Sequence, residues 1–433
     1  MGTLARSFFY DLLVPVSRRY LDELLAGYPR RDFQIRFWNG SLWGTEQHPR
    51  FTLVFNRPAA LRQFLSSPDE LSLGEAYLRD DFDIEGDIEA ALDLAHYLVN
   101  RHPGASAGPV LVTVFGQPVS RDETGRQPAS LAGTPHSRGR DRQAISYHYD
   151  LPPDFYALWL DRRMLYSSAY FASPDDDLDA AQERKLEFIC RKLRLRPGES
   201  LLDIGCGWGG LVMYAAERFG VQAHGITLSV PQAEMARQRI QAAGLQDRCR
   251  VEVCDYRDLQ GTRYDKIVSV GMVEHVGEAQ LPEYFGRTRD LLQPQGVFLN
   301  HGIAASATIR RPGRSFSERY VFPDSELVPI HTTLRAAEDS GFEMRDVESL
   351  REHYALTLHH WLRRLEAHAS EARHITNDAT YRTWRLYMAG AGYGFRTGRF
   401  NLYQTLLVKP ESGKSGLPLT RDDWYRGPRD KPI

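Results

Sequence analysis

Four closely spaced glycines follow a short apolar stretch near the middle of the chain. Residues 201–204 read Leu-Leu-Asp-Ile, and Gly205, Gly207, Gly209 and Gly210 come directly after them. Glycine allows the backbone to turn sharply and leaves no side chain between the backbone and a bound ligand. The residues after Gly210 are apolar at helical spacing. This pattern predicts a buried parallel strand, a tight turn and a helix, with a nucleotide-shaped cofactor at the carboxyl end of the strand.

The glycine spacing alone does not identify the cofactor, because it also satisfies the weak pattern of dinucleotide sites. A dinucleotide site needs an acidic residue about twenty positions further on to bind the ribose. The second predicted strand, 222–227, is instead followed by Leu228 and Ser229. Carboxylates occur at Asp203, inside the first strand, and at Asp255, after the third. This arrangement resembles the S-adenosylmethionine pocket of class I methyltransferases, which we favour over a dinucleotide site and over a turn that serves packing only.

The composition is that of a soluble globular protein of about two domains. The 433 residues are 42% hydrophobic and 25% charged, with a net charge of −2, so we expect no nucleic-acid partner. No apolar run reaches the length of a membrane span, and the N-terminus lacks a secretory pattern. The four cysteines have no metal-ligand spacing and are expected to be reduced thiols of a cytoplasmic protein. They are Cys190, Cys206, Cys249 and Cys254.

Residues 1–100 are expected to form a small α+β domain. The predicted elements are a helix-turn-helix over 4–25 interrupted at Pro15, antiparallel hairpins over 33–55, and helices over 58–99 apart from a turn at 80–86. The apolar residues of 4–25 pack on their own domain in one interpretation. In the other they touch a bilayer, because Phe8, Phe9 and Tyr10 are followed by Arg18 and Arg19.

The rest of the chain divides into three parts. Residues 101–143, rich in Pro, Gly, Ser and Arg, are predicted to be a linker with solvated arginines, and 410–433 a mobile tail. Over 144–409 strands and helices alternate, which predicts a doubly wound, mostly parallel sheet. The expected strands are 200–204, 221–227, 250–254, 264–270, 296–303 and 400–408, with a helix over 180–193 and others that begin near Pro231, Leu281 and Thr332.

Motifs along most of the chain resemble one enzyme family. They lie at 148–156, 166–171, 201–210, 225–232, 255–258, 267–277, 298–301 and 395–404, and in the first domain at 73–77 and 82–87. In order and spacing they resemble the cyclopropane-fatty-acyl-phospholipid synthase family, which includes the mycolic acid cyclopropane synthases. The most specific are Val-Gly-Met-Val-Glu-His-Val-Gly at 270–277 and Tyr-Ser-x-Ala-Tyr at 166–170.

The resemblance implies a class I methyltransferase that transfers methyl from S-adenosylmethionine to a cis double bond in an acyl chain of a membrane phospholipid. Loss of a proton then closes a cyclopropane ring. Thr227 and Gln232 would offer the ribose neutral hydrogen bonds. The cofactor residues implied are Tyr166, Ser167, Asp203, Gly205, Cys206, Gly207, Gly209, Thr227, Leu228, Gln232, Tyr256 and Arg257.

The resemblance also implies that a bicarbonate ion accepts the proton. Its implied ligands are Ser168, Gly271, Glu274, His301, Ile303 and Tyr354, of which Glu274, His301, Tyr354 and Ser168 are the catalytic candidates. Glu274 ends an apolar strand, where an unpaired structural charge would be costly. Aromatic faces could stabilise the carbocation left by methylation, although such residues, apart from Tyr166, more often belong to the core. The aromatic candidates are Tyr166, Tyr170, Phe171, Tyr284, Tyr320 and Trp361.

Position 168 departs from the family, which has cysteine where this chain has Ser168. If the thiol matters, the reaction could stop at a methyl-branched, methylene or hydroxylated acyl chain. The sequence is also compatible with a non-catalytic lipid-binding protein and with a small-molecule methyltransferase. For the enzyme, we expect peripheral association with the inner face of the cell membrane, and the first domain as a docking or homodimer surface.

Overall fold

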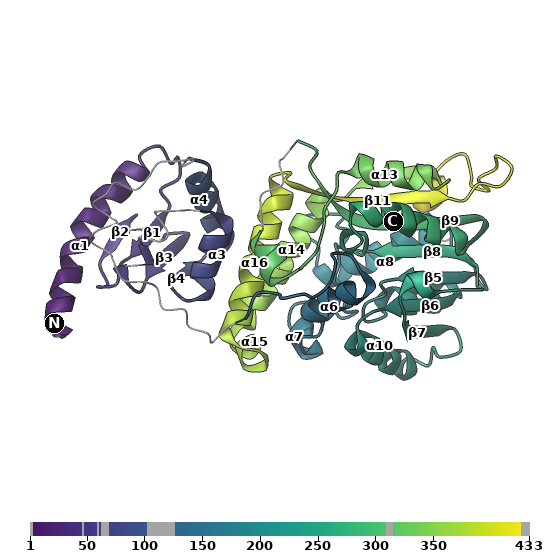
Figure 1. The fold of residues 1–433 in the computed structure, drawn as a ribbon, viewed down its shortest axis with the longest axis horizontal. Coiled ribbons are helices and arrows are strands. Elements are labelled where there is room, and N and C mark those ends of the chain that lie inside the picture. The colour runs from purple at the N-terminus through teal and green to yellow at the C-terminus, as the bar shows by residue number, and fades with distance from the viewer. Residues whose placement is uncertain are drawn as a thin grey trace. The chain divides into compact units, whose positions relative to one another are not determined.

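The computed structural model describes residues 3–45, 47–58, 60–61, 69–101, 126–308 and 315–425. The chain divides into two compact units. Unit 1 comprises Met1–Pro128, Pro312–Tyr320 and Asn377–Tyr393, and unit 2 comprises Ala129–Arg311, Val321–Thr376 and Gly394–Ile433. Figure 1 labels the elements of both.

A seven-stranded sheet forms the centre of unit 2, in the order β10-β11-β9-β8-β5-β6-β7 (Figure 1). Its strands are β5 (Ser200–Ile204), β6 (Gln222–Thr227), β7 (Cys249–Val253), β8 (Tyr264–Val270), β9 (Leu292–Ala305), β10 (Glu343–Ser349) and β11 (Phe400–Val408). Strands β5 to β9 are parallel to one another, and β11 is antiparallel to both β9 and β10. The predicted doubly wound α/β fold is confirmed.

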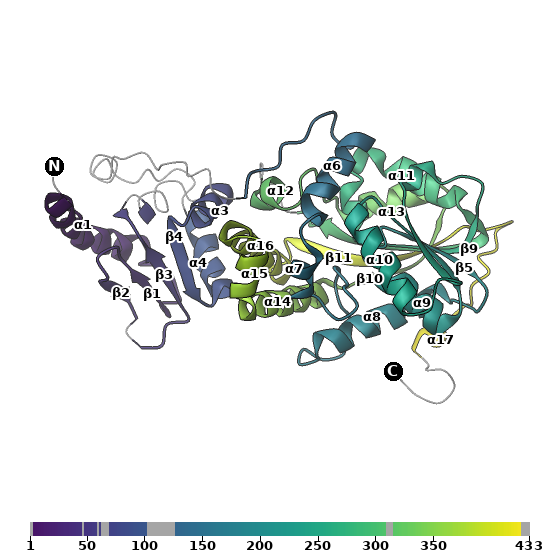
Figure 2. The ribbon, with the colours of Figure 1, turned by 90° about the horizontal axis from the view of Figure 1, so that it is seen from below.

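Helices cover both faces of this sheet because successive strand residues point to opposite sides. Leu201 faces the core under α8 (Leu178–Leu193), α9 (Gly210–Phe219) and α10 (Val230–Ala242). Leu202 faces the core under α11 (Leu281–Asp290) and α13 (Ile330–Asp339). Figure 2 shows these two groups of helices on opposite sides of the strands. Further helices of unit 2 are α6 (Arg138–Tyr149), α7 (Pro153–Ala157), α14 (Arg351–Ala367) and α15 (Ala369–Ile375).

Unit 1 contains a four-stranded sheet in the order β2-β1-β3-β4. Its elements are α1 (Thr3–Leu24), β1 (Phe33–Arg36), β2 (Leu42–Gly44), β3 (Phe51–Phe55), α3 (Glu70–Leu78), β4 (Phe82–Gly86), α4 (Ile88–Arg101) and α12 (Phe316–Tyr320). Two predictions were wrong here. Residues 80–86 include strand β4 rather than only a turn, and β1 pairs with β3 in parallel, so the hairpins are not all antiparallel.

The expected break at Pro15 is also wrong, because α1 is one continuous helix. A proline inside a helix removes one backbone hydrogen bond. The helix persists because one side of it is packed: Leu13, Leu21 and Leu24 are buried.

A late segment of the sequence completes unit 1, which the sequence did not predict. Residues 377–393, from α16 (Asp378–Arg396), carry two buried arginines. Arg382 forms ion pairs with Asp80 and Asp83, and Arg385 donates to the hydroxyl of Tyr77 at 2.9 Å.

The predicted linker is folded at its end. Residues 102–125 lie outside the described residues, but α6 begins at Arg138. Arg138 and Arg140 form ion pairs with Asp258 and Asp324, so they are not simply solvated as expected.

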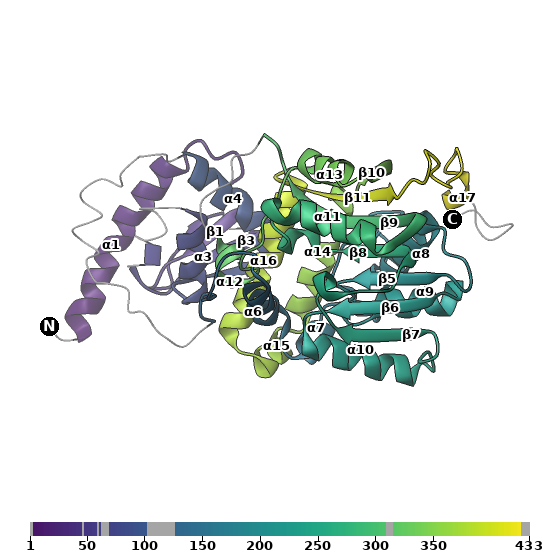
Figure 3. The ribbon, with the colours of Figure 1, turned by 45° about the vertical axis from the view of Figure 1, so that its right-hand side comes forward.

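The segment after residue 410 is anchored as far as Tyr425, in contrast to the mobile tail that we predicted. The short helix α17 (Asp422–Tyr425) lies beside α8 (Figure 3). Its Trp424 is only 2% exposed and belongs to the core under α8. Burial of one large aromatic side chain outweighs the polar, glycine-rich composition of the segment.

We expect Trp424→Ala to lower the free energy of unfolding by about 3 kcal/mol, the usual cost of removing a buried aromatic side chain. Urea denaturation followed by circular dichroism measures this. Leu419→Ala is the matched control, because Leu419 is fully exposed in the same segment, and should change the value by less than about 0.5 kcal/mol. Equal effects of the two substitutions would show that the segment is not anchored.

Candidate functional site

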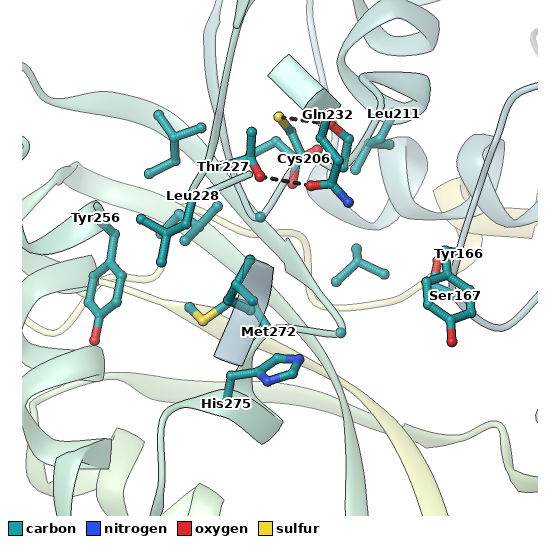
Figure 4. A pocket seen from close by; sticks show the side chains of 18 of the residues that line it. Tyr166, Ser167, Cys206, Leu211, Thr227, Leu228, Gln232, Tyr256, Met272 and His275 are labelled. Atoms are coloured by element: carbon teal, nitrogen blue, oxygen red, sulfur yellow. Dashed lines mark hydrogen bonds between the residues drawn. The ribbon is translucent and has the colours of Figure 1, made fainter. Parts of the chain in front are cut away.

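A cavity lies at the carboxyl ends of β5, β6 and β8. The strand order reverses between β5 and β8, which is where open α/β sheets bind their ligands. Figure 4 shows Tyr256 and Leu228 at one end of the cavity and Tyr166 and Ser167 at the other. The predicted cofactor residues in its lining are Tyr166, Ser167, Asp203, Gly205, Cys206, Gly207, Thr227, Leu228, Gln232, Tyr256 and Arg257.

The glycine turn after β5 forms one wall of the cavity. Gly205 and Gly207 have φ angles of 85° and 54°, a region that side chains disfavour. The N–H groups of Gly205 and Cys206 both donate to the carbonyl of Ile226, at 2.9 Å each. Gly209 does not line the cavity. A Cβ there would lie 3.1 Å from the Ala236 side chain, so Gly209 serves the packing of α9 against α10.

A neutral hydrogen-bonded pair lies at the end of β6. The hydroxyl of Thr227 donates to Oε1 of Gln232 at 2.8 Å and accepts the N–H of Ser229 (Figure 4). The amide nitrogen of Gln232 is the group of this pair that can donate to a ligand. A neutral donor at this position suits a ribose hydroxyl, as the sequence suggested.

Arg257 uses its guanidinium group within the protein. On the short helix η1 (Tyr256–Asp258) it bonds to Asp255 at 2.7 Å and to Asp141 of α6 at 2.9 Å. Hydrogen bonds from Arg257 lower the pKa of Asp255 despite its burial. This ion-pair network therefore fixes the wall of the cavity beside Tyr256. Because the guanidinium group of Arg257 is bonded to Asp255 and Asp141, Arg257 would affect a ligand by holding this wall in place.

The opposite end of the cavity contains a lysine that we did not predict. Lys185 of α8 is 1% exposed, and its Nζ donates to Oγ of Ser167 at 2.7 Å. Asp203 is 2% exposed, and its Oδ1 has no hydrogen-bond partner among the described residues. Burial raises the pKa of Asp203 to about 7, an effect that the charge of Lys185 opposes. Gln182 and Lys185 lie three residues apart among the buried residues of α8. Two polar residues on this otherwise apolar side were the sequence signal that could have identified Lys185.

The carboxyl group of Glu274 lies against β9. Glu274 is on the short helix η2 (Val273–His275), four residues after the end of β8 and not on that strand as expected. Its Oε1 accepts the backbone N–H of Ile303 at 2.7 Å. Gly302 permits this approach, since a Cβ there would lie 2.2 Å from Val273. Oε2 is buried without a hydrogen-bond partner in the described part of the chain, and burial raises the pKa of Glu274 to about 7.

His301, two residues before Ile303 on β9, is held by backbone and side-chain bonds. Its carbonyl accepts the N–H of Gly271 at 2.8 Å, and its Nδ1 lies 3.1 Å from Nε2 of Gln404 on β11. Its Nε2 is buried and, among the described residues, has no partner. Burial, reinforced by the charges of Lys185 and Lys192, lowers the pKa of His301 well below its usual range. The structure thus joins Gly271 to His301 and Glu274 to Ile303, at two neighbouring points of β9.

Tyr354 and Ser168 belong to the aromatic side of the site. The ring of Tyr354, on α14, lies 6.0 Å from that of Trp361, which is 5.2 Å from that of Tyr166. Thr357, also on α14, accepts the N–H of Ala169 at 2.9 Å. Ser168 is fully buried, and its hydroxyl donates to the carbonyl of Ala169 at 3.1 Å. Of the predicted bicarbonate ligands, only Gly271 is in the lining of the cofactor cavity, which does not include Ser168, Glu274, His301, Ile303 or Tyr354.

His275 and Met272 line the cavity and were not predicted (Figure 4). Burial, together with the neighbouring His136, lowers the pKa of His275 to about 4. His275 is therefore a neutral wall residue at physiological pH. Its place next to Glu274 in the motif was the signal that could have identified it.

The residues present fit S-adenosylmethionine. The cavity combines a glycine wall, a neutral donor pair at one end and buried charged groups at the other, which matches a nucleoside joined to an amino acid. None of the described helices has the length and apolar composition that a bilayer span requires.

Comparisons with known proteins agree with this geometry. The family model described as mycolic acid cyclopropane synthetase matches residues 136–405, and a domain of unknown function matches 20–100. A probable fatty acid methyltransferase of Pseudomonas putida is 41% identical over 399 residues, which are 91% of this chain and 96% of the relative. The cyclopropane-fatty-acyl-phospholipid synthase of Escherichia coli is 36% identical over 274 residues, which are 63% of this chain and 69% of the relative.

A solved structure shares its fold with part of this chain. The mycolic acid cyclopropane synthase CmaA1 complexed with SAH and CTAB is 32% identical, with a TM-score of 0.59 over 62% of this chain and 98% of that chain. The family model covers more than half of the sequence, and the expected resemblance is confirmed. The chain belongs to the mycolic acid cyclopropane synthetase family of S-adenosylmethionine-dependent methyltransferases.

Proposed function

We propose that this enzyme methylates the cis double bond of an unsaturated acyl chain in a membrane phospholipid and that loss of a proton then closes a cyclopropane ring. The observation that carries the proposal is a pair of buried groups near the end of β9, Oε2 of Glu274 and Nε2 of His301, which have no hydrogen-bond partners among the described residues. S-adenosylmethionine, when bound, supplies an electrophilic methyl group. The residues of the chain must then exclude water and accept a proton.

The aromatic side of the site supports the exclusion of water. The ring of Tyr166 lies 5.2 Å from those of Trp159 and Trp361, and 6.5 Å from that of Phe322. A carbocation on the acyl chain would be trapped by water, whereas aromatic faces stabilise it without reacting. This aromatic group suits an apolar substrate that passes through a cationic state.

The electrostatics of Glu274 and His301 support an oxyanion as the proton acceptor. Neutral His301 bonded to Gln404 through Nδ1 carries its hydrogen on Nε2, and Glu274 in its protonated form presents a second O–H donor. Two donors to one small anion would hold bicarbonate, which would accept the proton of the substrate. Glu274 would release its own proton and then take over that one from the bicarbonate. We propose bicarbonate as this base.

Ser168 supports a second outcome, in which the ring does not close. The resemblance implies that the family usually has cysteine at this position, and the P. putida relative that spans most of the chain is named a probable fatty acid methyltransferase. The cation could then lose a proton elsewhere and give a methylene or methyl-branched chain.

We expect Ser168→Cys to increase the share of cyclopropane in the product if the hydroxyl limits ring closure. The Ser168 side chain is fully buried. Because serine and cysteine have similar volumes, the substitution mainly changes the hydrogen bonding of this side chain. Gas chromatography of the product lipids measures the share. An unchanged ratio would mean that position 168 acts through its backbone and that the second outcome loses its support.

Mass spectrometry of lipids after expression in a host without cyclopropane lipids tests the proposed function. Ring formation adds one methylene group and leaves no reducible double bond, so hydrogenation separates the cyclopropane from the methylene product. Unmodified lipids despite cofactor binding would favour a lipid-binding protein, and modification of small molecules alone would exclude an acyl substrate.

Because acyl chains lie inside the bilayer, we also propose that the enzyme associates with the membrane peripherally, on the cytoplasmic face, and that unit 1 supplies the docking or homodimer surface. Deleting residues 1–100 would remove Asp80 and Asp83, the ion-pair partners of Arg382. Full-length Arg18→Glu/Arg19→Glu is therefore the better variant. Weaker flotation with anionic liposomes would support docking through this surface, and unchanged flotation would count against it.

A further inference from the structure

Lys185 is a buried cation in the wall of the cofactor cavity. Its side chain is 1% exposed and lines the cavity together with Ser167 and Asp203. Its Nζ donates to the hydroxyl oxygen of Ser167 at 2.7 Å, and no carboxylate of the described residues forms an ion pair with it. The charges of Asp161 and Asp203 act on Lys185 without an ion-pair contact. A buried ammonium group that makes no ion pair is costly, and a ligand carboxylate in this cavity would offset that cost.

Asp203 presents the opposite charge in the same cavity. It is 2% exposed, and its Oδ1 has no hydrogen-bond partner in the described part of the chain. Asp161 is the other acidic group near Lys185, but its two oxygens accept the backbone N–H groups of Arg163 and Leu165. Lys185 and Asp203 are therefore a separated pair of opposite charges, each with capacity for a ligand.

The segment that carries Ser167 is fixed to α8 by the neighbouring Gln182. Its amide donates to the carbonyls of Leu165 at 3.2 Å and Ser167 at 2.9 Å. Because the oxygen of Ser167 accepts the bond from Lys185, its hydrogen remains available for another acceptor. Lys185 thereby orients the hydroxyl of Ser167 as a donor.

We propose that Lys185, directly and through Ser167, binds the α-carboxylate of the methionyl group of the cofactor, and that Asp203 receives its α-ammonium group. The neutral pair Thr227 and Gln232 lies between Ser167 and the opposite end of the cavity, which Leu228 and Tyr256 form (Figure 4). That end suits the nucleoside, which leaves the zwitterionic end of the cofactor for Lys185 and Asp203. The proposal rests on the cofactor assignment made above.

Binding calorimetry with three ligands tests this role without requiring turnover. S-adenosylhomocysteine has the whole amino acid, decarboxylated S-adenosylmethionine lacks the carboxylate, and 5′-deoxy-5′-methylthioadenosine lacks the amino acid. For Lys185→Met, we expect S-adenosylhomocysteine to bind at least tenfold more weakly, and the other two ligands to bind within about twofold of the wild type. Ser167→Ala should give a smaller loss with the same dependence on the carboxylate.

Equal losses for all three ligands would show that Lys185 only supports the structure and would overturn the proposal, as would unchanged binding of S-adenosylhomocysteine. If Lys185→Met does not fold, Ser167→Ala decides by the same comparison. A wild-type protein that binds none of the three would overturn the cofactor assignment as well.

Discussion

Glu274→Gln is expected to reduce turnover at least a hundredfold while cofactor affinity stays within about twofold. Glutamine preserves the bond that Oε1 accepts from Ile303, but it cannot take up or release a proton. Positioned acid–base groups typically contribute about 10²–10⁴ in rate. Methyl transfer to unsaturated phospholipid vesicles measures turnover, and calorimetry with S-adenosylhomocysteine measures affinity.

Glu283→Gln is the matched control, because Glu283 is an exposed carboxylate on the nearby helix α11. It should leave both quantities unchanged. Near-normal turnover in Glu274→Gln would remove Glu274 from the proton path, and a parallel loss of cofactor affinity would indicate a structural role.

The same substitution gives a pH-dependent difference in stability. The pKa of Glu274 is raised from 4.5 to about 7 in the folded protein. Its protonated form therefore favours folding at low pH, and this contribution is lost as the pH rises through 7. Between pH 6 and pH 9 the free energy of unfolding should fall by about 1 kcal/mol more in the wild type than in Glu274→Gln. Parallel stability curves would contradict the raised pKa.

Gly205→Val is the second substitution with a large expected effect, a loss of at least a hundredfold in affinity for S-adenosylhomocysteine. Gly205 has a φ of 85° and lines the cavity. A β-branched residue is strained in that region, at a cost of about 1–3 kcal/mol, and its side chain would occupy the wall of the cavity.

Gly244→Val is the control that separates the effect of backbone strain from the effect of a side chain in the cavity. Gly244 has a φ of 66°, lies outside the cavity, and has open space where a Cβ would be. Both variants should lose similar stability in urea denaturation, but only Gly205→Val should lose affinity. Comparable affinity losses in the two variants would mean that the glycine turn does not contact the cofactor.

The sequence predicted the elements whose residues follow one simple periodicity. Strands β5, β6 and β8 are mostly buried, and they lie within a residue of the expected positions. The edge strand β10 was not predicted, because its sequence Glu-Met-Arg-Asp-Val-Glu-Ser is mostly charged and only Asp346 in it is buried. At an edge, backbone pairing with β11 forms a strand that the side chains do not indicate.

Long-range pairing accounts for most of what could not be predicted. Strand β4 looked like a turn, and its place in the sheet depends on pairing with β3. Arg382, far along the chain, completes unit 1 through ion pairs with residues near position 80. Trp424 anchors a segment whose composition is that of a tail. In each case the decisive contact joins positions that no local pattern connects.

In the candidate site, the sequence motifs predicted most of the residues that we name in the cavity lining, but they did not predict every charged residue there, such as Lys185. The bond from the backbone of Ile303 to Glu274 depends on how η2 packs against β9, which the motif spacing does not specify. Lys185 was missed because a lysine on a helix is usually exposed, and its burial becomes visible only when α8 is packed on the sheet.

The central claim is that methylation of an acyl double bond ends with loss of a proton from the transferred carbon. Methyl-deuterated S-adenosylmethionine, incubated with the enzyme and unsaturated phospholipid vesicles, tests it most directly when the lipids are analysed by mass spectrometry before and after hydrogenation. We predict that the product has lost one deuterium from the transferred methyl and takes up no hydrogen at the modified position. A product that retains every deuterium of that methyl, or that is reduced at the modified position, would contradict ring closure.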